Sequence, residues 1–300
     1  MANTGSVPTT LLRRRIGRAF KLLREQAGKT LDDAAEDLDR GRATIGRIEQ
    51  GAETVRFREA DVRAMLDLYK APDELRQQLL ALTAETRNGN KPWWHDYTKT
   101  ALPEHMRLFI AMENAAEFIR KYEQEVIPGL LQTRRYAETV LDTPRGYATE
   151  EEAAMRVQLR MDRQSVLSKP RAPRLEAILS EAAIRRTVGG PEIMAEQIEH
   201  LLTASQQNNI SIRVMPFDVG IHGGAVAGAF SLMDFPPDLE GDVPIEDPLV
   251  YADTITGALY LDKPDEVAAY RQVWQDMVER ALTDDQTREL LHTVLKGLQK

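Results

Sequence analysis

Apolar residues recur at a helical period through the first third of the chain. Over residues 12–26, Ile16, Phe20 and Leu23 fall on one face of a helix. The same period predicts further helices over residues 31–38, 42–50, 62–69 and 73–87. The pattern therefore predicts an N-terminal domain of five helices, covering residues 12–87.

The rest of the chain has a mixed pattern. A short helix is expected through Tyr136 and Leu141, and longer helical periods cover 104–124, 149–168, 191–205, 264–282 and 284–299. Strands are predicted at 174–179 and at 210–217, where apolar residues alternate, and two more strands with glycine-bearing turns within 223–235 and 248–261. The expected fold class is mainly α, with a C-terminal α+β domain.

The composition of the segments that lack a periodic pattern predicts the domain boundaries. A chain of 300 residues is long enough for roughly two domains. Residues 1–11 have the composition of a disordered tail, and 88–92 lie in a stretch, TRNGNKP, typical of a linker. The predicted domains are therefore residues 12–87 and 93–300.

Charge is distributed unevenly between these parts. The whole chain carries a formal net charge of −8, yet residues 1–70 hold 14 Lys and Arg against 11 Asp and Glu. The N-terminal part is thus net +3, and the remainder is net −11. Such asymmetry indicates a nucleic-acid-binding part joined to an acidic body, although a net +3 is also what an ordinary solvated surface carries.

Several classes of chemistry are disfavoured by the sequence. It has no cysteine, which excludes disulfides and thiolate metal sites, and its five histidines lack metal-ligand spacing. We therefore expect no metal and no cofactor. The first ten residues have no apolar run, and no stretch approaches the roughly 18 apolar residues of a membrane span. We expect a cytoplasmic protein without a membrane partner.

The spacing of the second and third predicted helices indicates a helix-turn-helix motif. Two short helices are separated by a tight break at residues 39–41. Such a break holds the third helix so that its outer face is free to enter the major groove of DNA. Ile45 and Ile48 mark its buried side. The outward side holds Arg42, Ala43, Gly46 and Arg47.

The stretch LREQAGKTLDDAAEDLDRGRATIGRIEQG, residues 23–51, resembles the Xre or phage-repressor type of helix-turn-helix. The ending IxRIExG is a specific part of that pattern. The resemblance implies a five-helix, lambda-repressor-like domain in which Arg24 and Glu49 form a structural ion pair. Carried over by position, it implies that Arg42, Ala43, Gly46 and Arg47 face the base edges of double-stranded DNA. Arginine suits this role because it pairs bidentately with guanine.

Phosphate contacts are expected from cations and one hydroxyl group around this helix. The candidates are Arg13, Arg14, Arg15, Arg40, Thr44, Arg56 and Arg58. The chain departs from the family pattern at Leu31, Arg40 and Gly41, where glutamine, an apolar residue, and serine or threonine are common. The family pattern therefore does not predict the geometry of this turn. The alternative role for the arginines is to solvate the helix.

The second domain carries a resemblance of its own. The segments WWHDY (93–97) and YEQEVIPGLLQT (122–133), among others across 90–298, resemble the C-terminal domain of WhiJ-like actinobacterial Xre-type regulators. That resemblance implies a small partner protein encoded by a neighbouring gene, in an antitoxin-like arrangement. Trp93, Trp94 and Tyr97 follow the linker directly. They either line a ligand pocket or seal the joint between domains, and the joint is favoured.

These patterns lead to one main hypothesis and one alternative. The main hypothesis is a homodimeric, sequence-specific transcriptional regulator that reads a palindromic operator with the helix at 42–50. A partner protein or small effector would control it through residues 93–300. The alternative is an antitoxin-like protein that chiefly binds the neighbouring-gene product and uses DNA binding for autoregulation. We expect no enzyme, because 93–300 show no nucleophile–base pair, and the glycine-rich segment 221–230 is interpreted as a turn between strands.

Overall fold

The structure is a computed structural model that describes residues 9–52, 54–88, 97, 104–142, 149–237, 246–254 and 257–299. The chain forms two compact units. The helical unit comprises residues 1–95 together with 237–246, and the sheet unit comprises 96–236 together with 247–300. The predicted tail overlaps the first helix, which begins at Thr9, while residues 1–8 and 89–92 lie outside the described residues.

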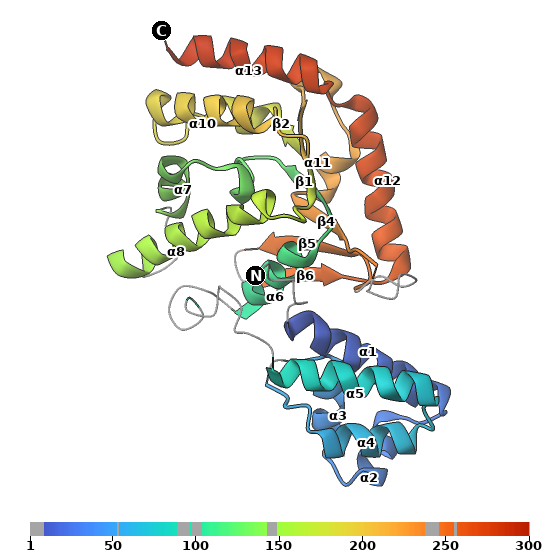
Figure 1. The fold of residues 1–300 in the computed structure, drawn as a ribbon. Coiled ribbons are helices and arrows are strands. Elements are labelled where there is room, and N and C mark those ends of the chain that lie inside the picture. The colour runs from blue at the N-terminus through green and yellow to red at the C-terminus, as the bar shows by residue number, and fades with distance from the viewer. Residues whose placement is uncertain are drawn as a thin grey trace. The chain divides into compact units, whose positions relative to one another are not determined.

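The helical unit contains the five helices predicted from the apolar period (Figure 1). They are α1 (Thr9–Gln26), α2 (Leu31–Asp37), α3 (Arg42–Glu49), α4 (Glu59–Leu68) and α5 (Asp73–Asn88). Ile16 and Phe20 of α1 are completely buried, as is Ile45 of α3, and all three belong to one apolar core. The apolar face of each helix thus turns inward, as burial of apolar surface requires.

The sheet unit is built on six strands in the order β3-β2-β1-β4-β5-β6. The strands are β1 (Phe118–Glu123), β2 (Arg174–Ser180), β3 (Ile210–Met215), β4 (Phe230–Asp234), β5 (Leu249–Thr254) and β6 (Gly257–Leu261). The first three are mutually parallel, with Ile119 opposite Leu175 and Leu175 opposite Ile210. β4, β5 and β6 continue as antiparallel neighbours. The predicted α+β class is confirmed.

Helices cover both faces of this sheet (Figure 1). α7 (Arg134–Leu141), α8 (Glu150–Arg163) and α10 (Pro191–Ala204) lie on one side, and α12 (Pro264–Arg280) lies on the other. The crossovers from β1 to β2 and from β2 to β3 are helical, as parallel strands require. On the α12 side, Tyr122, Ile178 and Phe230 pack in one buried cluster with Trp274 and Met277.

The predicted helix at 104–124 is wrong in its second half. The helix α6 (Glu104–Ala115) ends at Ala115. Residues 118–123 form β1, which lies between β2 and β4. Phe109, Met112, Ala116 and Ile119 fit one face of a helix, but Ile119 lies in a strand whose charged residues have partners in the sheet. Arg120 pairs with Asp234, and Lys121 Nζ lies 3.0 Å from Glu123 Oε1. A central strand can hold such charges when neighbouring residues neutralise them.

Two further expectations for the second domain need correction. The segment 223–235 does not begin as a strand, because GGAVA forms a short helix, α11 (Gly223–Ala227), before β4. The segment 221–230 is therefore more than a turn between strands. Residues 248–261 contain two strands, β5 and β6, in which Thr254 pairs with Gly257. The predicted helix at 149–168 is α8 followed by a 3-10 turn, Gln164–Ser168.

The PGLLQT segment forms a corner held by buried amides. Leu130 and Leu131 point into the core. Gln132 Nε2 donates to the Ile127 carbonyl at 2.7 Å, and Gln197 Nε2 donates to the Leu131 carbonyl at 2.7 Å. Each buried carbonyl thereby gains the donor that its removal from water requires. The PGLLQT motif therefore has a structural role in this unit.

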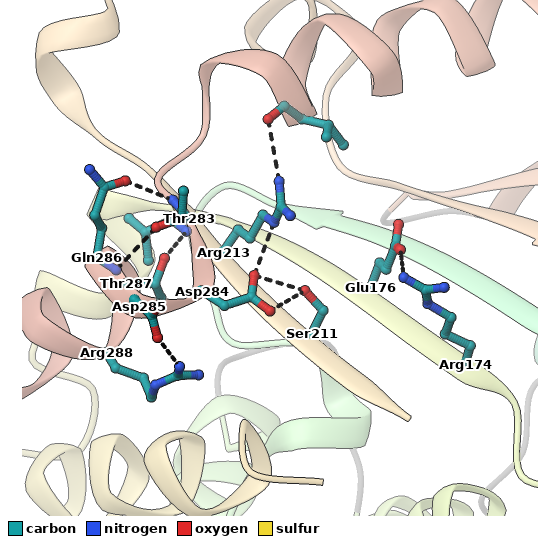
Figure 2. A network of polar contacts seen from close by, with 12 residues as sticks. Arg174, Glu176, Ser211, Arg213, Thr283, Asp284, Asp285, Gln286, Thr287 and Arg288 are labelled. Carbon is teal, nitrogen blue, oxygen red and sulfur yellow. Dashed lines mark hydrogen bonds and ion pairs between the residues drawn. The ribbon is translucent and has the colours of Figure 1, made fainter. Parts of the chain in front are cut away.

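A polar network closes the outer edge of the sheet at β3 (Figure 2). Asp284, at the start of α13 (Asp284–Leu298), accepts from Ser211 Oγ at 3.1 Å and from Arg213 Nε at 3.0 Å. The Val214 amide donates to Thr287 Oγ1 at 3.0 Å. The Leu282 amide donates to the Val214 carbonyl at 2.9 Å. The outward backbone groups of Val214 are therefore satisfied by the chain itself, which protects this edge from pairing with another strand.

Candidate nucleic-acid interface

The inner side of α3 is held against α1 at van der Waals distance. A Cβ at Gly17 of α1 would lie 2.5 Å from the carbonyl oxygens of Ile48 and Glu49. A Cβ at Gly51, just after α3, would lie 2.6 Å from the Arg14 backbone, and Gly51 also has a φ of +64°. Glycine is needed at both places, because the backbones approach more closely than a side chain allows. These contacts fix which side of α3 faces outward.

Arg24 and Glu49 form a buried ion pair between the ends of α1 and α3. Arg24 Nε donates to Glu49 Oε1 at 2.6 Å, and Arg24 Nη2 donates to Oε2 at 3.0 Å. The two residues are only 7% and 8% exposed. The hydrogen bond to Glu49 raises the pKa of Arg24 above its usual value. Such a two-point bond fixes angle as well as distance, so it orients α3 on α1.

The tight turn between α2 and α3 closes at Asp39. Asp39 has a φ of 51°, in the left-handed region that aspartate tolerates. The Arg40 amide donates to the Ala35 carbonyl at 2.9 Å. Gly41 is extended, with a φ of −68°, and caps α3 without any side-chain hydrogen bond. The left-handed residue of the turn is therefore Asp39. Arg40 and Gly41, where the chain departs from the family pattern, need no positive φ.

The outward side of α3 presents the residues expected to face DNA. Arg42, Ala43 and Arg47 are exposed and Gly46 is half-buried, whereas Ile45, Ile48 and Glu49 are buried. Thr44 is half-buried, and its Oγ1 accepts from Arg47 Nη2 at 3.5 Å. Two guanidinium groups and a methyl group therefore lie together on one exposed helical face. This is the set of groups that can contact guanine edges and the thymine methyl.

Two cations around this face have carboxylate partners. Arg42 Nη1 lies 3.4 Å from Asp32 Oδ2, and Arg40 Nη2 lies 2.7 Å from Asp61 Oδ1. Arg47 has no ion-pair partner among the described residues. The sequence pattern pointed to the cations, but it did not reveal these acids as their neighbours. The signal available in the sequence was the high acidity of the second helix, LDDAAED.

The arginines of α1 have roles within the helical unit. Arg13 donates to the Val55 carbonyl, and its guanidinium carbon lies 5.7 Å from the centre of the Phe57 ring. Arg14 and Arg18 both pair with the carboxylate of Glu246, which is completely buried and clusters with this unit. Arg13 and Arg14 are therefore engaged by protein groups in this structure, and a phosphate would compete with those groups.

Three other candidate phosphate contacts lie on the surface. Arg15 is half-buried on α1, while Arg56 and Arg58 are exposed in the segment between α3 and α4. Arg58 directly precedes α4, at its N-cap position. Their role as phosphate contacts stays a prediction. The two exposed arginines have side chains open to solvent close to α3 along the chain, as such contacts require.

The aromatic residues after the linker are only partly described. Trp93 and Trp94 lie outside the described residues, so their predicted role at a joint or pocket stays a prediction. Tyr97 belongs to the sheet unit, where its hydroxyl donates to Asp162 Oδ2 of α8 at 2.5 Å. This hydrogen bond ties the start of the sheet unit to α8.

The sheet unit has a cavity lined by described residues. It measures about 480 Å³ and lies between α7 and α8. Arg134, Glu138 and Asp142 line it, together with apolar atoms of Val157. The residues that join the two helices, 143–148, lie outside the described part of the chain. The lining offers charges of both signs.

Within the described ranges, no three His, Asp or Glu side chains converge as a metal site would need. Across the same ranges, no helix is both long and apolar enough to span a membrane.

Comparison with known families defines the class of the helical unit. The helix-turn-helix domain family matches residues 15–79. Together with the arrangement of α2 and α3, this match makes the unit a helix-turn-helix domain, with which regulators bind DNA. The chain belongs to the family described as "Domain of unknown function (DUF5753)", which matches residues 106–293, more than half of its length. No curated protein and no solved structure matches the chain.

Proposed function

We propose that this protein is a sequence-specific transcriptional regulator that reads its operator with the outer face of α3. The observation that carries the proposal is the placement of Arg42, Ala43 and Arg47. They are exposed on a helix whose opposite side is locked to α1 by Gly17 and the Arg24–Glu49 pair. A rigidly held helix with exposed arginines can bring several donors to base edges at once.

The proposal includes a homodimer bound to a palindromic operator. A single α3 has eight residues and can contact only a few base pairs. Two copies of α3 about 34 Å apart would read two half-sites one turn of DNA apart.

We propose that the sheet unit is the regulatory part. It has its own core and forms most of the region that defines the family. Its resemblance to the WhiJ-like C-terminal domain supports control by a small partner protein or a small effector. The proposal assigns no enzymatic reaction to the chain. In the antitoxin-like alternative, binding of the partner protein is the main role and DNA binding serves autoregulation.

The proposal is tested by selecting duplexes from a random-sequence library with the full-length chain. We expect enrichment of one sequence with two-fold symmetry, and Arg47→Ala should abolish or alter the enrichment. The matched control is Arg63→Ala, because Arg63 is an exposed arginine on α4 that pairs with Glu59 at 2.8 Å. Failure to enrich any sequence would contradict the proposed function.

A second measurement separates the regulator from the antitoxin-like alternative. Affinity for the selected duplex is measured with and without the protein encoded by the neighbouring gene. A regulator under partner control should change its affinity when that protein is added. Stable binding of the partner without any change in DNA affinity would favour the alternative.

A further inference from the structure

Asp32 is the acidic residue beside Arg42, the first residue of α3, and the capped start of α2 holds it there. Asp32 lies in the first turn of α2, and the neighbouring Asp33 completes the cap of that helix. Asp33 Oδ2 accepts from the Thr30 amide at 2.8 Å, and the Asp33 amide donates to Thr30 Oγ1 at 3.1 Å. The helix start is therefore fixed without the Asp32 side chain, whose carboxylate lies 3.4 Å from Arg42 Nη1.

Arg42 lacks support from its own helix. It is the first residue of α3, where a positive side chain opposes the helix macrodipole. The first turn of α3 contains no acidic residue, and Gly41 offers no side-chain cap. Asp32 supplies the nearby negative charge from another helix. The contrast is Arg47, in the last turn, where a cation suits the macrodipole and no carboxylate is paired with it among the described residues.

From this geometry we propose that Asp32 is a positioning residue for Arg42, and that it sets how strictly α3 selects one base pair. The proposal rests on the proposed function, because it concerns a DNA contact. A guanidinium has five N–H donors in a fixed plane. Attraction of one terminal nitrogen to the Asp32 carboxylate, 3.4 Å away, limits the orientations of that plane, and donors remain for guanine O6 and N7.

The negative charge of Asp32 should also make α3 select its base pair more strictly. An unrestrained arginine at a groove edge is attracted to any phosphate, which increases affinity for every sequence. A carboxylate beside it repels phosphates and reduces that general attraction. Asp32 and Arg42 have side chains that are 68% and 66% exposed, so the pair contributes little to folding. Its effect should therefore be visible in DNA selection and hardly at all in stability.

The test uses the full-length chain, the duplex that the wild type selects, and all single-base-pair changes of that duplex. Asp32→Asn removes the charge and the ion pair while keeping the size of the side chain. The matched control is Glu36→Gln on the same helix, because Glu36 is exposed and has no ion-pair partner among the described residues. Each variant is also melted to establish that it is folded.

We expect Asp32→Asn to weaken discrimination about tenfold at one base pair, the same pair that Arg42→Ala affects. Glu36→Gln should raise affinity for all duplexes by a common factor and leave discrimination unchanged. If Asp32→Asn changes all affinities by a common factor and leaves discrimination at every base pair unchanged, Asp32 acts only through general charge and the proposal is wrong.

A double variant provides an independent check. In an Arg42→Ala background, Asp32→Asn should cause no further loss of discrimination, because the group that it positions is gone. A further loss would show that Asp32 acts elsewhere and would overturn its assigned role. If the wild type selects no sequence at all, the proposed function fails, and the role of Asp32 fails with it. Selection by the wild type with identical behaviour of Asp32→Asn and Glu36→Gln overturns the role of Asp32 alone.

Discussion

The helical unit and the sheet unit each contain a buried, bidentate arginine–glutamate pair, and the two pairs have nearly the same geometry. In the sheet unit, Arg163 Nε donates to Glu113 Oε1 at 2.9 Å and Arg163 Nη2 donates to Oε2 at 2.8 Å. Arg163 is 7% exposed and Glu113 4%. The pair in the helical unit, Arg24–Glu49, is likewise bidentate and buried. The two units thus use the same device to fix one helix against another.

The difference lies in what each device supports. Arg24–Glu49 fixes the inner side of α3 and leaves cations on the outer side. Arg163–Glu113 joins the ends of α8 and α6 within the sheet unit, where a separate polar network ties α13 to the β3 edge of the sheet (Figure 2). One pair orients a surface suited to recognition, and the other stabilises a scaffold. The same interaction therefore says nothing about function until its surroundings are known.

Removal of either glutamate should have the largest effect. Glu49→Ala and Glu113→Ala each leave a buried arginine uncompensated, which should cost about 3–5 kcal/mol of unfolding free energy. Hydrogen exchange of the full chain, followed by mass spectrometry, separates peptides of the two units. We expect protection to fall mainly in the unit that carries the change.

The control for this pair of variants is Glu25→Ala. Glu25 is also near Arg24, at 3.6 Å, but its side chain is 51% exposed. An exposed pair contributes about 0–1 kcal/mol, so this variant should unfold almost like the wild type. Equal losses from Glu25→Ala and Glu49→Ala would refute the distinction between the buried and the exposed contact.

Glycine replacements should separate a backbone contact from a side-chain contact. Gly17→Ala places its Cβ 2.5 Å from two carbonyl oxygens of the α3 backbone, whereas Gly224→Ala in the sheet unit meets the side chains of Met277 and Tyr122. Overpacking costs about 1–3 kcal/mol, and Gly17→Ala should lie at the upper end because backbone atoms cannot rotate away. Thermal unfolding of the full chain measures both losses.

Gly46→Ala is the control, and it should shift stability in the opposite direction. A Cβ at Gly46 has no heavy atom within 4 Å. Alanine in a helix interior is favoured over glycine by about 1 kcal/mol, so this variant should melt at a higher temperature. A loss of stability at Gly46 would mean that the outer face of α3 is not open.

Arg42→Ala should affect DNA binding but not folding. We expect a loss of about 1–3 kcal/mol in binding of the selected duplex, concentrated at one base pair. Titration of single-base-pair variants with the full chain measures this loss. A uniform loss across all duplexes would make Arg42 a phosphate contact. The corresponding change in the sheet unit, Arg213→Ala, should leave base preference unchanged, because Arg213 is bonded to Asp284.

Mild acid should destabilise the sheet unit more than the helical unit. This is the smallest of the expected effects. The sequence has no histidine before His95, whereas His200 and His222 of the sheet unit have pKa values lowered by burial. Below pH about 6.5 the unfolded chain binds protons that these folded histidines resist. The stability of the sheet unit should therefore be full above that pH and decrease as pH falls through it.

Hydrogen exchange at pH about 7.5 and about 5.5, corrected for intrinsic rates, measures this effect. Peptides from β1 to β6 should lose protection, while peptides from α1 to α5 should keep it. Replacement of His200 and His222 by asparagine should flatten the pH dependence. Equal losses of protection in both units would assign the effect to groups other than these histidines.

The sequence predicted the helical unit more completely than the sheet unit, for a physical reason. Each helix of the helical unit is set by contacts within a few residues, so a period of apolar positions is enough to locate it. β1 was missed because Ile119 continues the helical period of Phe109, Met112 and Ala116. Only its place between β2 and β4 decides the strand, through hydrogen bonds to residues more than 50 positions away.

The candidate interface was predictable in part. The outward residues of α3 follow from helical geometry, since Ile45 and Ile48 define its inner side. The partners of those residues do not follow from it. The pairing of Arg42 with Asp32 depends on how α2 is turned against α3, and the engagement of Arg14 depends on Glu246, far away in the chain.

By itself, the sequence determined the five helices, the tight turn before α3, the α+β class of the remainder and the face of α3 that carries cations. All of these depend on local periodicity and local backbone preference. Tertiary structure alone decided the order of the six strands and the pairing of Arg163 with Glu113. It also decided which arginines near α3 have acidic neighbours. Such pairings depend on the packing of distant segments, which no local pattern encodes.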